Sequence, residues 1–125
     1  HAHILINDHL FQWVLENLLR NALDSMEAKG KISCYIHHTN DYVCLDITDT
    51  GKGIPNSKFK TVFQPGYSTK QRGWGLGLSL AKRIIEEYHN GKIFVKSSKI
   101  GEGTTFTVKL PKTALMPKNK YNFSK

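Results

Sequence analysis

Hydrophobic residues recur every three or four positions between residues 11 and 26, a spacing that predicts one long amphipathic helix. Asn7 or Asp8 offers an N-cap before this helix, and Gly30 is a suitable residue to end it. The positions expected to face the core are Phe11, Val14, Leu15, Leu18, Leu19, Ala22, Leu23 and Met26.

Apolar and polar residues then alternate in two separate regions, and each region predicts a β-hairpin. The first hairpin turns at residues 39–41, and the second turns at the glycine-containing residues 101–103. A further short strand is expected before the helix. The expected strands are residues 4–6, 32–36, 43–47, 92–97 and 104–110.

A second helix is expected over residues 76–88, because apolar residues such as Leu80, Ile84 and Ile85 again recur at helical spacing. Between the first hairpin and this helix, residues 49–77 form a loop rich in glycine and polar residues, with one helical turn expected at residues 58–63. Loops of this length in compact domains usually carry function.

This order of elements predicts an α/β fold: a two-layer sandwich in which helices cover one face of a mixed, mainly antiparallel sheet. The chain has 125 residues, so one domain is expected, and it is placed at residues 1–111. Residues 112–125 contain lysines but no hydrophobic period, and they are expected to be a basic tail or linker.

Charge and composition narrow the possible partners. The formal net charge is +8, but the lysines are scattered, and no stripe of basic and aromatic residues predicts a nucleic-acid partner. No run of 18 apolar residues and no signal-peptide pattern is present, so we expect no direct membrane insertion and a cytoplasmic location, with a membrane anchor in the parent protein left open. Cys34 and Cys44 are expected to be reduced packing residues.

Three glycines precede the second helix in the stretch RGWGLGLSLAKR, at Gly73, Gly75 and Gly77. A helix N-terminus exposes unpaired N–H groups, and glycines let an anion approach them closely. The spacing GxGxG is neither a dinucleotide fingerprint nor a P-loop. A flexible loop followed by a helix remains the alternative interpretation.

A carboxylate follows the second strand of the first hairpin, in the stretch DTGKGIP. Since strand side chains alternate, Asp49 shares the inward face with Leu45 and Ile47. Gly51 and Gly53 would open a slot for a flat ring whose amino group donates a hydrogen bond to Asp49. The alternative is an Asp-Gly turn with a solvated carboxylate.

Two asparagines, Asn17 and Asn21, lie four residues apart on the first helix and therefore share one side of it. Asparagine is a poor helix former, and its amide oxygen suits Mg²⁺, which takes its other ligands from water and phosphate. The alternative is a pair of boundary asparagines that make hydrogen bonds within the helix.

The order NxxxN on a helix, DxGxG after a strand, GxGxG before a helix and GTTF in the last strand resembles the ATP-binding catalytic domain of sensor histidine kinases. These domains belong to the gyrase, chaperone, histidine kinase and mismatch-repair ATPase superfamily, with the Bergerat-type ATP-binding fold. The resemblance covers roughly residues 10–111. It implies that ATP and Mg²⁺ are the cofactors.

The resemblance also implies a role for individual residues. Asn21 would be the magnesium ligand, Asp49 would bind the adenine amino group, and Thr105 would reach adenine, often through water. Phe59 or Phe63 would anchor a lid whose basic residues meet the phosphates. The full nucleotide-binding set implied is Asn17, Asn21, Asp49, Gly51, Gly53, Ile54, Phe63, Lys70, Arg72, Gly73, Gly75, Leu76, Gly77, Leu78 and Thr105.

A kinase of this type passes the γ-phosphoryl group to a histidine on a separate dimerisation hairpin, and from there to a response regulator. No such hairpin is recognisable in this chain, so it is expected to be a monomeric catalytic fragment. The alternative is a self-contained ATPase or a regulatory nucleotide-binding domain. Related ATPases carry a catalytic glutamate where this chain has Asn17, so Glu16 is only a weak candidate for a general base.

Overall fold

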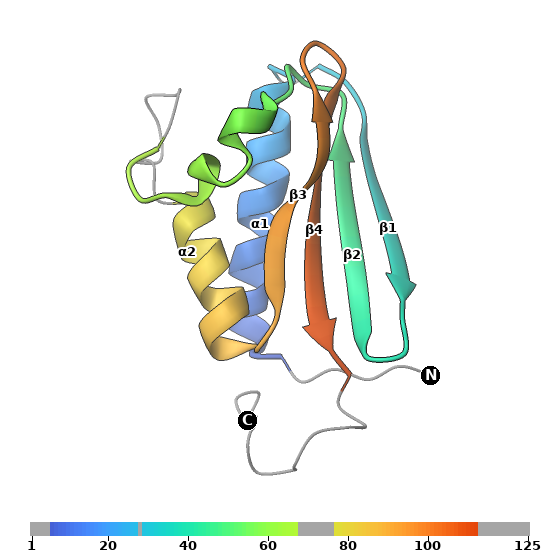
Figure 1. The fold of residues 1–125 in the computed structure, drawn as a ribbon, viewed down its shortest axis with the longest axis vertical. Coiled ribbons are helices and arrows are strands. Elements are labelled where there is room, and N and C mark those ends of the chain that lie inside the picture. The colour runs from blue at the N-terminus through green and yellow to red at the C-terminus, as the bar shows by residue number, and fades with distance from the viewer. Residues whose placement is uncertain (1–5, 28, 68–76, 113–125) are drawn as a thin grey trace.

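The computed structural model places every helix it describes on one face of a four-stranded sheet (Figure 1). Residues 6–27, 29–67 and 77–112 are described. The two α-helices are α1 (Asp8–Ser25) and α2 (Gly77–Arg83), and a π-helical segment, Ile84–Tyr88, continues α2. The strands are β1 (Ile32–His38), β2 (Tyr42–Asp49), β3 (Lys92–Lys99) and β4 (Gly103–Pro111). The two-layer α/β sandwich is confirmed.

The sheet has the strand order β1-β2-β4-β3, and all its pairs are antiparallel. The expectation of a mixed sheet is therefore not met by the described strands. Residues 4 and 5 of the expected leading strand lie outside the described residues, and Ile6 is not in a strand. The two hairpins were predicted correctly because period-two alternation is a strong signal in half-buried strands.

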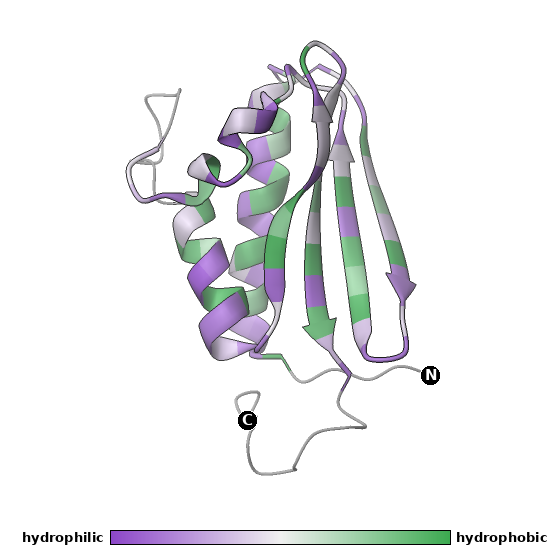
Figure 2. Cartoon of the chain, in the orientation of Figure 1, coloured by the Kyte–Doolittle hydropathy of each residue, from purple (hydrophilic) through white to green (hydrophobic). Residues whose placement is uncertain are grey.

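The hydrophobic core lies between the helices and the middle of the sheet. Val14 and Leu18 from α1 meet Ile85 from the segment after α2, and Phe106 and Val108 contribute from β4. All five are at most 3% exposed. Figure 2 shows the resulting pattern, with hydrophobic and hydrophilic residues alternating along the strands.

Part of the expected apolar face of α1 is not buried. Leu19 is 38% exposed and Leu23 is 47% exposed, and Ile36 on β1 is 68% exposed. The physical reason is that α1 packs on β2, whereas β1 is an edge strand that the helices do not cover. Helical spacing alone could not show which of the apolar residues of α1 would pack against the sheet and which would stay exposed.

A buried histidine ties the end of the second helical segment to the start of α1. His89 is 2% exposed, and its Nε2 accepts a hydrogen bond from the backbone N–H of Asn7 at 3.0 Å. Its Nδ1 therefore carries the proton that is donated to the carbonyl of Ile84 at 2.9 Å. Burial lowers the pKa of His89 below its ordinary value of 6.5, and the bond to Ile84 opposes this only in part. The neutral imidazole, with its proton on Nδ1, is the form that makes both hydrogen bonds.

The helix ends differ from the predicted ones. Asn7 is the N-cap of α1, because its side chain accepts a hydrogen bond from the N–H of Leu10. That helix ends at Ser25, before the predicted stop at Gly30. The turn expected at residues 58–63 is replaced by two 3₁₀ turns, Asn56–Lys58 and Thr61–Phe63. Within the described residues, no helix is both long enough and apolar enough to cross a membrane.

Candidate nucleotide-binding site

Asp49 is the last residue of β2 and lies on the sheet face that the helices cover. It is 3% exposed, and one carboxylate oxygen accepts a hydrogen bond from the N–H of Gly51 at 2.8 Å. Its neighbours across the sheet are Ile32 on β1 and Thr104 on β4. The period-two prediction of an inward carboxylate is thus confirmed, and the solvated Asp-Gly turn is wrong.

The two glycines after Asp49 are required by close packing of the chain on itself. A Cβ on Gly51 would lie 2.1 Å from the hydroxyl of Ser25, at the end of α1. A Cβ on Gly53, whose φ is +82°, would lie 2.3 Å from the carbonyl oxygen of Lys99. The prediction that these glycines leave an open slot needs correction, since protein atoms fill the space beside each of them.

Hydrogen bonds hold the same loop against the β3–β4 hairpin. The hydroxyl of Ser98 accepts from the N–H of Ile54 at 2.7 Å and donates to the carbonyl of Gly103 at 2.9 Å. It also lies 2.8 Å from the hydroxyl of Thr104. On the other side, the N–H of Lys52 bonds to the carbonyl of Ser25. The loop that follows Asp49 is thus clamped at both ends, which fixes the carboxylate.

The asparagine helix and the glycine-rich segment meet at the start of α2. A Cβ on Gly77 would lie 2.7 Å from Oδ1 of Asn17, so only glycine fits there without a shift. The amide nitrogen of Asn17 donates to the carbonyl of Trp13 at 3.0 Å. Asn17 therefore makes a bond within the helix, as the alternative interpretation held, and its oxygen also contacts the glycine-rich motif.

The other polar residues of α1 differ in their surroundings. Asn21 is half-buried, one helical turn beyond Asn17 and on nearly the same side of α1. Glu16 is exposed, and it accepts a hydrogen bond from the side chain of Gln12 at 3.3 Å. This exposed position adds no support to the weak candidacy of Glu16 as a general base.

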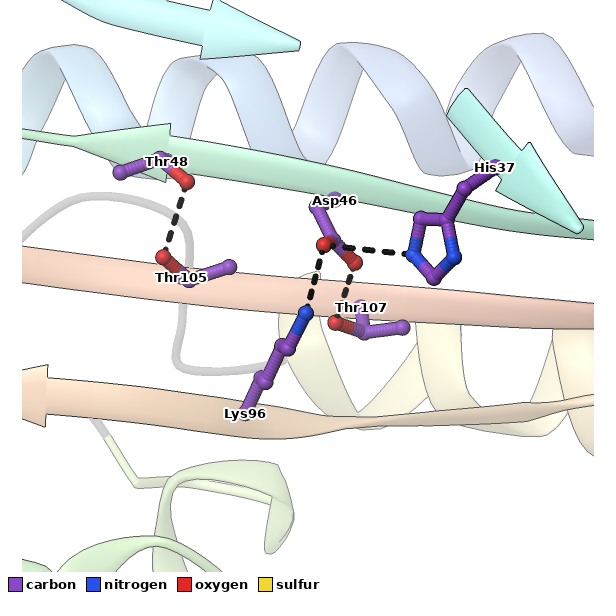
Figure 3. A network of polar contacts seen from close by, with 6 residues as sticks. All are labelled: His37, Asp46, Thr48, Lys96, Thr105 and Thr107. Carbon is purple, nitrogen blue, oxygen red and sulfur yellow. Dashed lines mark hydrogen bonds and ion pairs between the residues drawn. The ribbon is translucent and has the colours of Figure 1, made fainter. Parts of the chain in front are cut away.

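The two threonines of the GTTF motif face opposite sides of the sheet. The hydroxyl of Thr105 lies 2.8 Å from that of Thr48, on the sheet face away from the helices (Figure 3). Thr104 is 4% exposed and pairs directly with Asp49 across β2 and β4. Because side chains alternate along a strand, the inward threonine is the one two residues before Phe106. Thr104 was missed, although the same period-two argument could have found it.

The aromatic anchor belongs to the core. Phe63 is 8% exposed and packs edge-on against Phe106, with ring centroids 6.0 Å apart. Phe59 and Leu78 are partly buried against the same core. This packing supports the anchoring role predicted for Phe63, at the point where the chain leaves toward the expected lid. The predicted lid residues Lys70, Arg72, Gly73, Gly75 and Leu76 lie outside the described residues.

A shallow hollow of about 520 Å³ lies beside the end of α1 and is lined by residues that include Asp24, Thr50, Gly51 and Lys52. Neither of the two asparagines nor Asp49 lines it. The hollow thus lies next to the clamped loop, and of the predicted nucleotide-binding residues that the structure describes it includes Gly51.

The sequence matches one family model over residues 7–114, and that family is described as histidine kinase-, DNA gyrase B- and HSP90-like ATPases. The matched region includes both helices, all four strands and the clamped loop. The chain belongs to this family, and within it to the catalytic ATPase domains of sensor histidine kinases.

Curated relatives are bacterial sensor kinases. The chain is 42% identical over 105 residues to the sensor histidine kinase ZraS of Salmonella typhimurium, with 83% of this chain and 22% of the relative covered. It is 40% identical over 114 residues to the adaptive-response sensory kinase SasA of Synechocystis, with 86% and 29% covered. The chain thus spans less than a third of the length of these relatives.

Solved structures agree with the sequence relationship. The catalytic domain of the histidine kinase ThkA superposes with a TM-score of 0.74 at 31% identity, covering 86% of this chain and 70% of that one. The mycobacterial sensor histidine kinase MprB superposes with a TM-score of 0.78 at 25% identity, covering 87% and 74%. The fold is therefore that of a histidine kinase catalytic domain.

Proposed function

We propose that this chain binds Mg-ATP and transfers its γ-phosphoryl group to a histidine on a separate helical dimerisation domain. The observation that carries the proposal is the contact of Gly77 with Asn17, which joins the glycine-rich motif to the asparagine helix. Phosphoryl transfer needs mainly positioning and charge neutralisation from the protein. The chain therefore needs no nucleophile of its own.

The purine end of the nucleotide is assigned to the end of β2. Asp49 would accept a hydrogen bond from the adenine amino group, and Thr104, paired with it, would take the place first predicted for Thr105. The clamp of Ser98 and Ser25 on the intervening loop holds the carboxylate in place before any ligand arrives. Such preorganisation lowers the entropy cost of binding.

The phosphate end is assigned to α1 and the start of α2. Asn21 would supply one amide oxygen to Mg²⁺, a hard cation that retains water and takes its remaining ligands from phosphate oxygens. The half-buried position of Asn21, one turn from the contact with Gly77, fits this donor set. Lys70 and Arg72 would neutralise phosphate charge, and Gly73 and Gly75 would offer backbone N–H groups.

Partners follow from the same proposal. The phosphoacceptor histidine would lie on a helical hairpin outside this chain, and a response regulator would then take the phosphoryl group. The chain itself is proposed to be a cytoplasmic monomer, attached in its parent protein to the domains that the longer relatives contain. Residues 112–125 would serve as a linker or tail.

Calorimetric titration with ATP in the presence of Mg²⁺ tests the purine assignment. Asp49→Asn should weaken the affinity at least about tenfold, because the carboxylate acceptor loses half of its acceptor capacity. Asp46→Asn is the matched control, since Asp46 is as deeply buried but lies on the opposite sheet face. Equal affinities for the wild type and Asp49→Asn would remove the purine role.

The metal assignment has its own test. Asn21→Ala should remove most of the gain in ATP affinity that Mg²⁺ produces, whereas Asn40→Ala, in the exposed β1–β2 turn, should leave that gain intact. Losses of equal size with and without Mg²⁺ would contradict the metal role of Asn21.

A third experiment separates the kinase from a self-contained ATPase. The chain, Mg-ATP and a purified histidine-hairpin domain of a relative should together produce acid-labile phosphate on the hairpin. Steady release of inorganic phosphate by the chain alone, without transfer, would instead indicate an ATPase.

A further inference from the structure

One face of the sheet carries none of the described helices. All the described helices lie on the other side, and the view in Figure 3 looks onto the uncovered side with the helices behind it. We call this the open face, and its side chains include those of Tyr35, Asp46, Lys92, Phe94, Lys96, Thr105 and Lys109. Lys96 lies at the irregularity between Val95 and Ser97 and is placed on this face by its hydrogen bond to Asp46. The others each alternate with a residue that points toward the helices.

The open face has one acidic side chain among the described strand residues, and that side chain is already neutralised. Asp46 is 5% exposed, its Oδ1 accepts from Thr107 at 2.7 Å, and its Oδ2 accepts from Lys96 at 2.9 Å (Figure 3). The Nε2 of His37 lies 3.4 Å from the same Oδ2. Burial tends to raise the pKa of Asp46, but these hydrogen bonds and positive charges outweigh it and hold the pKa below 3.8.

The other two lysines of the open face have no such counterion. Lys92 and Lys109 are directly paired across β3 and β4, and neither forms an ion pair with a described residue. Like charges directly opposite one another destabilise a sheet. The ammonium group of Lys109 lies 4.5 Å from the ring centroid of Tyr42, which draws it toward β2 but does not neutralise it. An external anionic group would relieve this repulsion.

Aromatic side chains accompany the lysines. Phe94 follows Lys92 on the same face of β3 and is 36% exposed, and Tyr35 on β1 is 64% exposed. The ring of Tyr35 stacks on that of His37, with centroids 5.2 Å apart. Exposed aromatic residues are typical of protein interfaces, where they provide large rigid contact areas.

We propose that the open face is a docking surface for an acidic protein segment, whose carboxylates pair with Lys92 and Lys109 while an apolar side chain packs on Phe94 or Tyr35. This surface is separate from the nucleotide site, since Asp49 and Thr104 point to the opposite side of the sheet. It would give the domain a second contact, independent of ATP, with another protein that carries such a segment.

A protein segment fits this surface better than a nucleic acid does. Consecutive bases stack on neighbouring aromatic side chains, but Tyr35 and Phe94 lie on the two edge strands, about 14 Å apart at three strand spacings. The carboxylate of Asp46 lies between them. An anionic membrane is a poorer partner, because Phe94, on an edge strand and only 36% exposed, offers little insertion depth.

The test uses the full chain and a fluorescein-labelled peptide of glutamate and phenylalanine residues, followed by fluorescence anisotropy. The double variant Lys92→Glu with Lys109→Glu should bind this peptide about tenfold more weakly. This variant keeps the like-charge opposition but loses the contact of Lys109 with the Tyr42 ring, so its thermal stability should fall only slightly below that of the wild type. Lys29→Glu with Lys31→Glu is the control, with the same change in net charge on the exposed α1–β1 loop.

The control double variant should bind the peptide no more than about twofold more weakly than the wild type, because only the general effect of net charge acts there. Tyr35→Ser, which leaves the charge unchanged, should also weaken peptide binding, and Mg-ATP affinity should be the same in all these variants. If the open-face and the control double variants lost peptide affinity equally, the proposal would be overturned. Tighter binding to oligo-dT or to phosphatidylserine vesicles that the open-face variants abolish would also overturn it, because the face would then serve a nucleic acid or a membrane.

Discussion

Asp49 and Thr104 are direct neighbours across the β2–β4 ladder, and both side chains are nearly fully buried on the face covered by the helices. The adjacent pair, Thr48 and Thr105, lies on the opposite face with its hydroxyls 2.8 Å apart. Two threonines that are consecutive in the sequence thus belong to different surfaces of the protein, and only one of them can accompany Asp49.

This relationship leads to the first prediction. Thr104→Val should weaken ATP binding about fivefold to tenfold, because it removes a hydroxyl beside the purine carboxylate. Thr105→Val removes a hydroxyl of the same size from the open face and should leave ATP affinity unchanged. Calorimetry on the two variants checks this, and a larger effect from Thr105→Val would restore the original assignment.

The close approach of Gly77 and Asn17 leads to a second prediction. The effect of Gly77→Ala on the unfolding free energy should change sign when Asn17 is also replaced. Gly77→Ala should lower the unfolding free energy by about 1 kcal/mol, because the new methyl group meets Oδ1 of Asn17. In an Asn17→Ala background the same change should raise it by about 0.5 kcal/mol, since alanine is the better helix residue. Urea unfolding of the four proteins gives the coupling directly. Additive effects would contradict the contact.

Two glycines with the same backbone angle provide a third prediction. Gly53 and Gly101 both have a φ of +82°, but only Gly53 has backbone within reach of a Cβ. Gly101→Ala should therefore cost about 1 kcal/mol, from backbone strain alone. Gly53→Ala should cost at least about 3 kcal/mol, because the carbonyl of Lys99 must also move. Thermal unfolding compares the two, and similar losses would show that the loop is not clamped.

The buried histidine predicts a pH dependence of stability. Because the pKa of His89 is lowered in the folded state, the unfolded chain binds this proton more readily. The contribution of His89 is fully present above pH 6.5 and is lost as the pH falls from 6.5 toward the folded pKa. His89→Gln keeps an acceptor for the N–H of Asn7 but does not titrate. The variant should show a flatter dependence of unfolding free energy on pH between about 7.5 and 5.

Local patterns along the sequence predicted most elements and several site residues. The spacing of Val14 and Leu18 predicts α1, and the alternation through Ile47 predicts β2 and places Asp49 on its inward face. These predictions succeed because helix and strand periods are local geometric properties that each segment carries by itself. The family resemblance rested on motif order, which is also a property of the sequence alone.

Relations between distant segments were decided by the tertiary structure. The sequence does not show that Ser25 fills the space beside Gly51, that Gly77 lies against Asn17, or that Leu19 is left exposed on α1. The open face is a further case, because lysines scattered in the sequence gather on one surface only after β3 and β4 pair. Such relations depend on how separate elements pack, and the free energy of packing is a property of the whole assembled domain and not of any one segment.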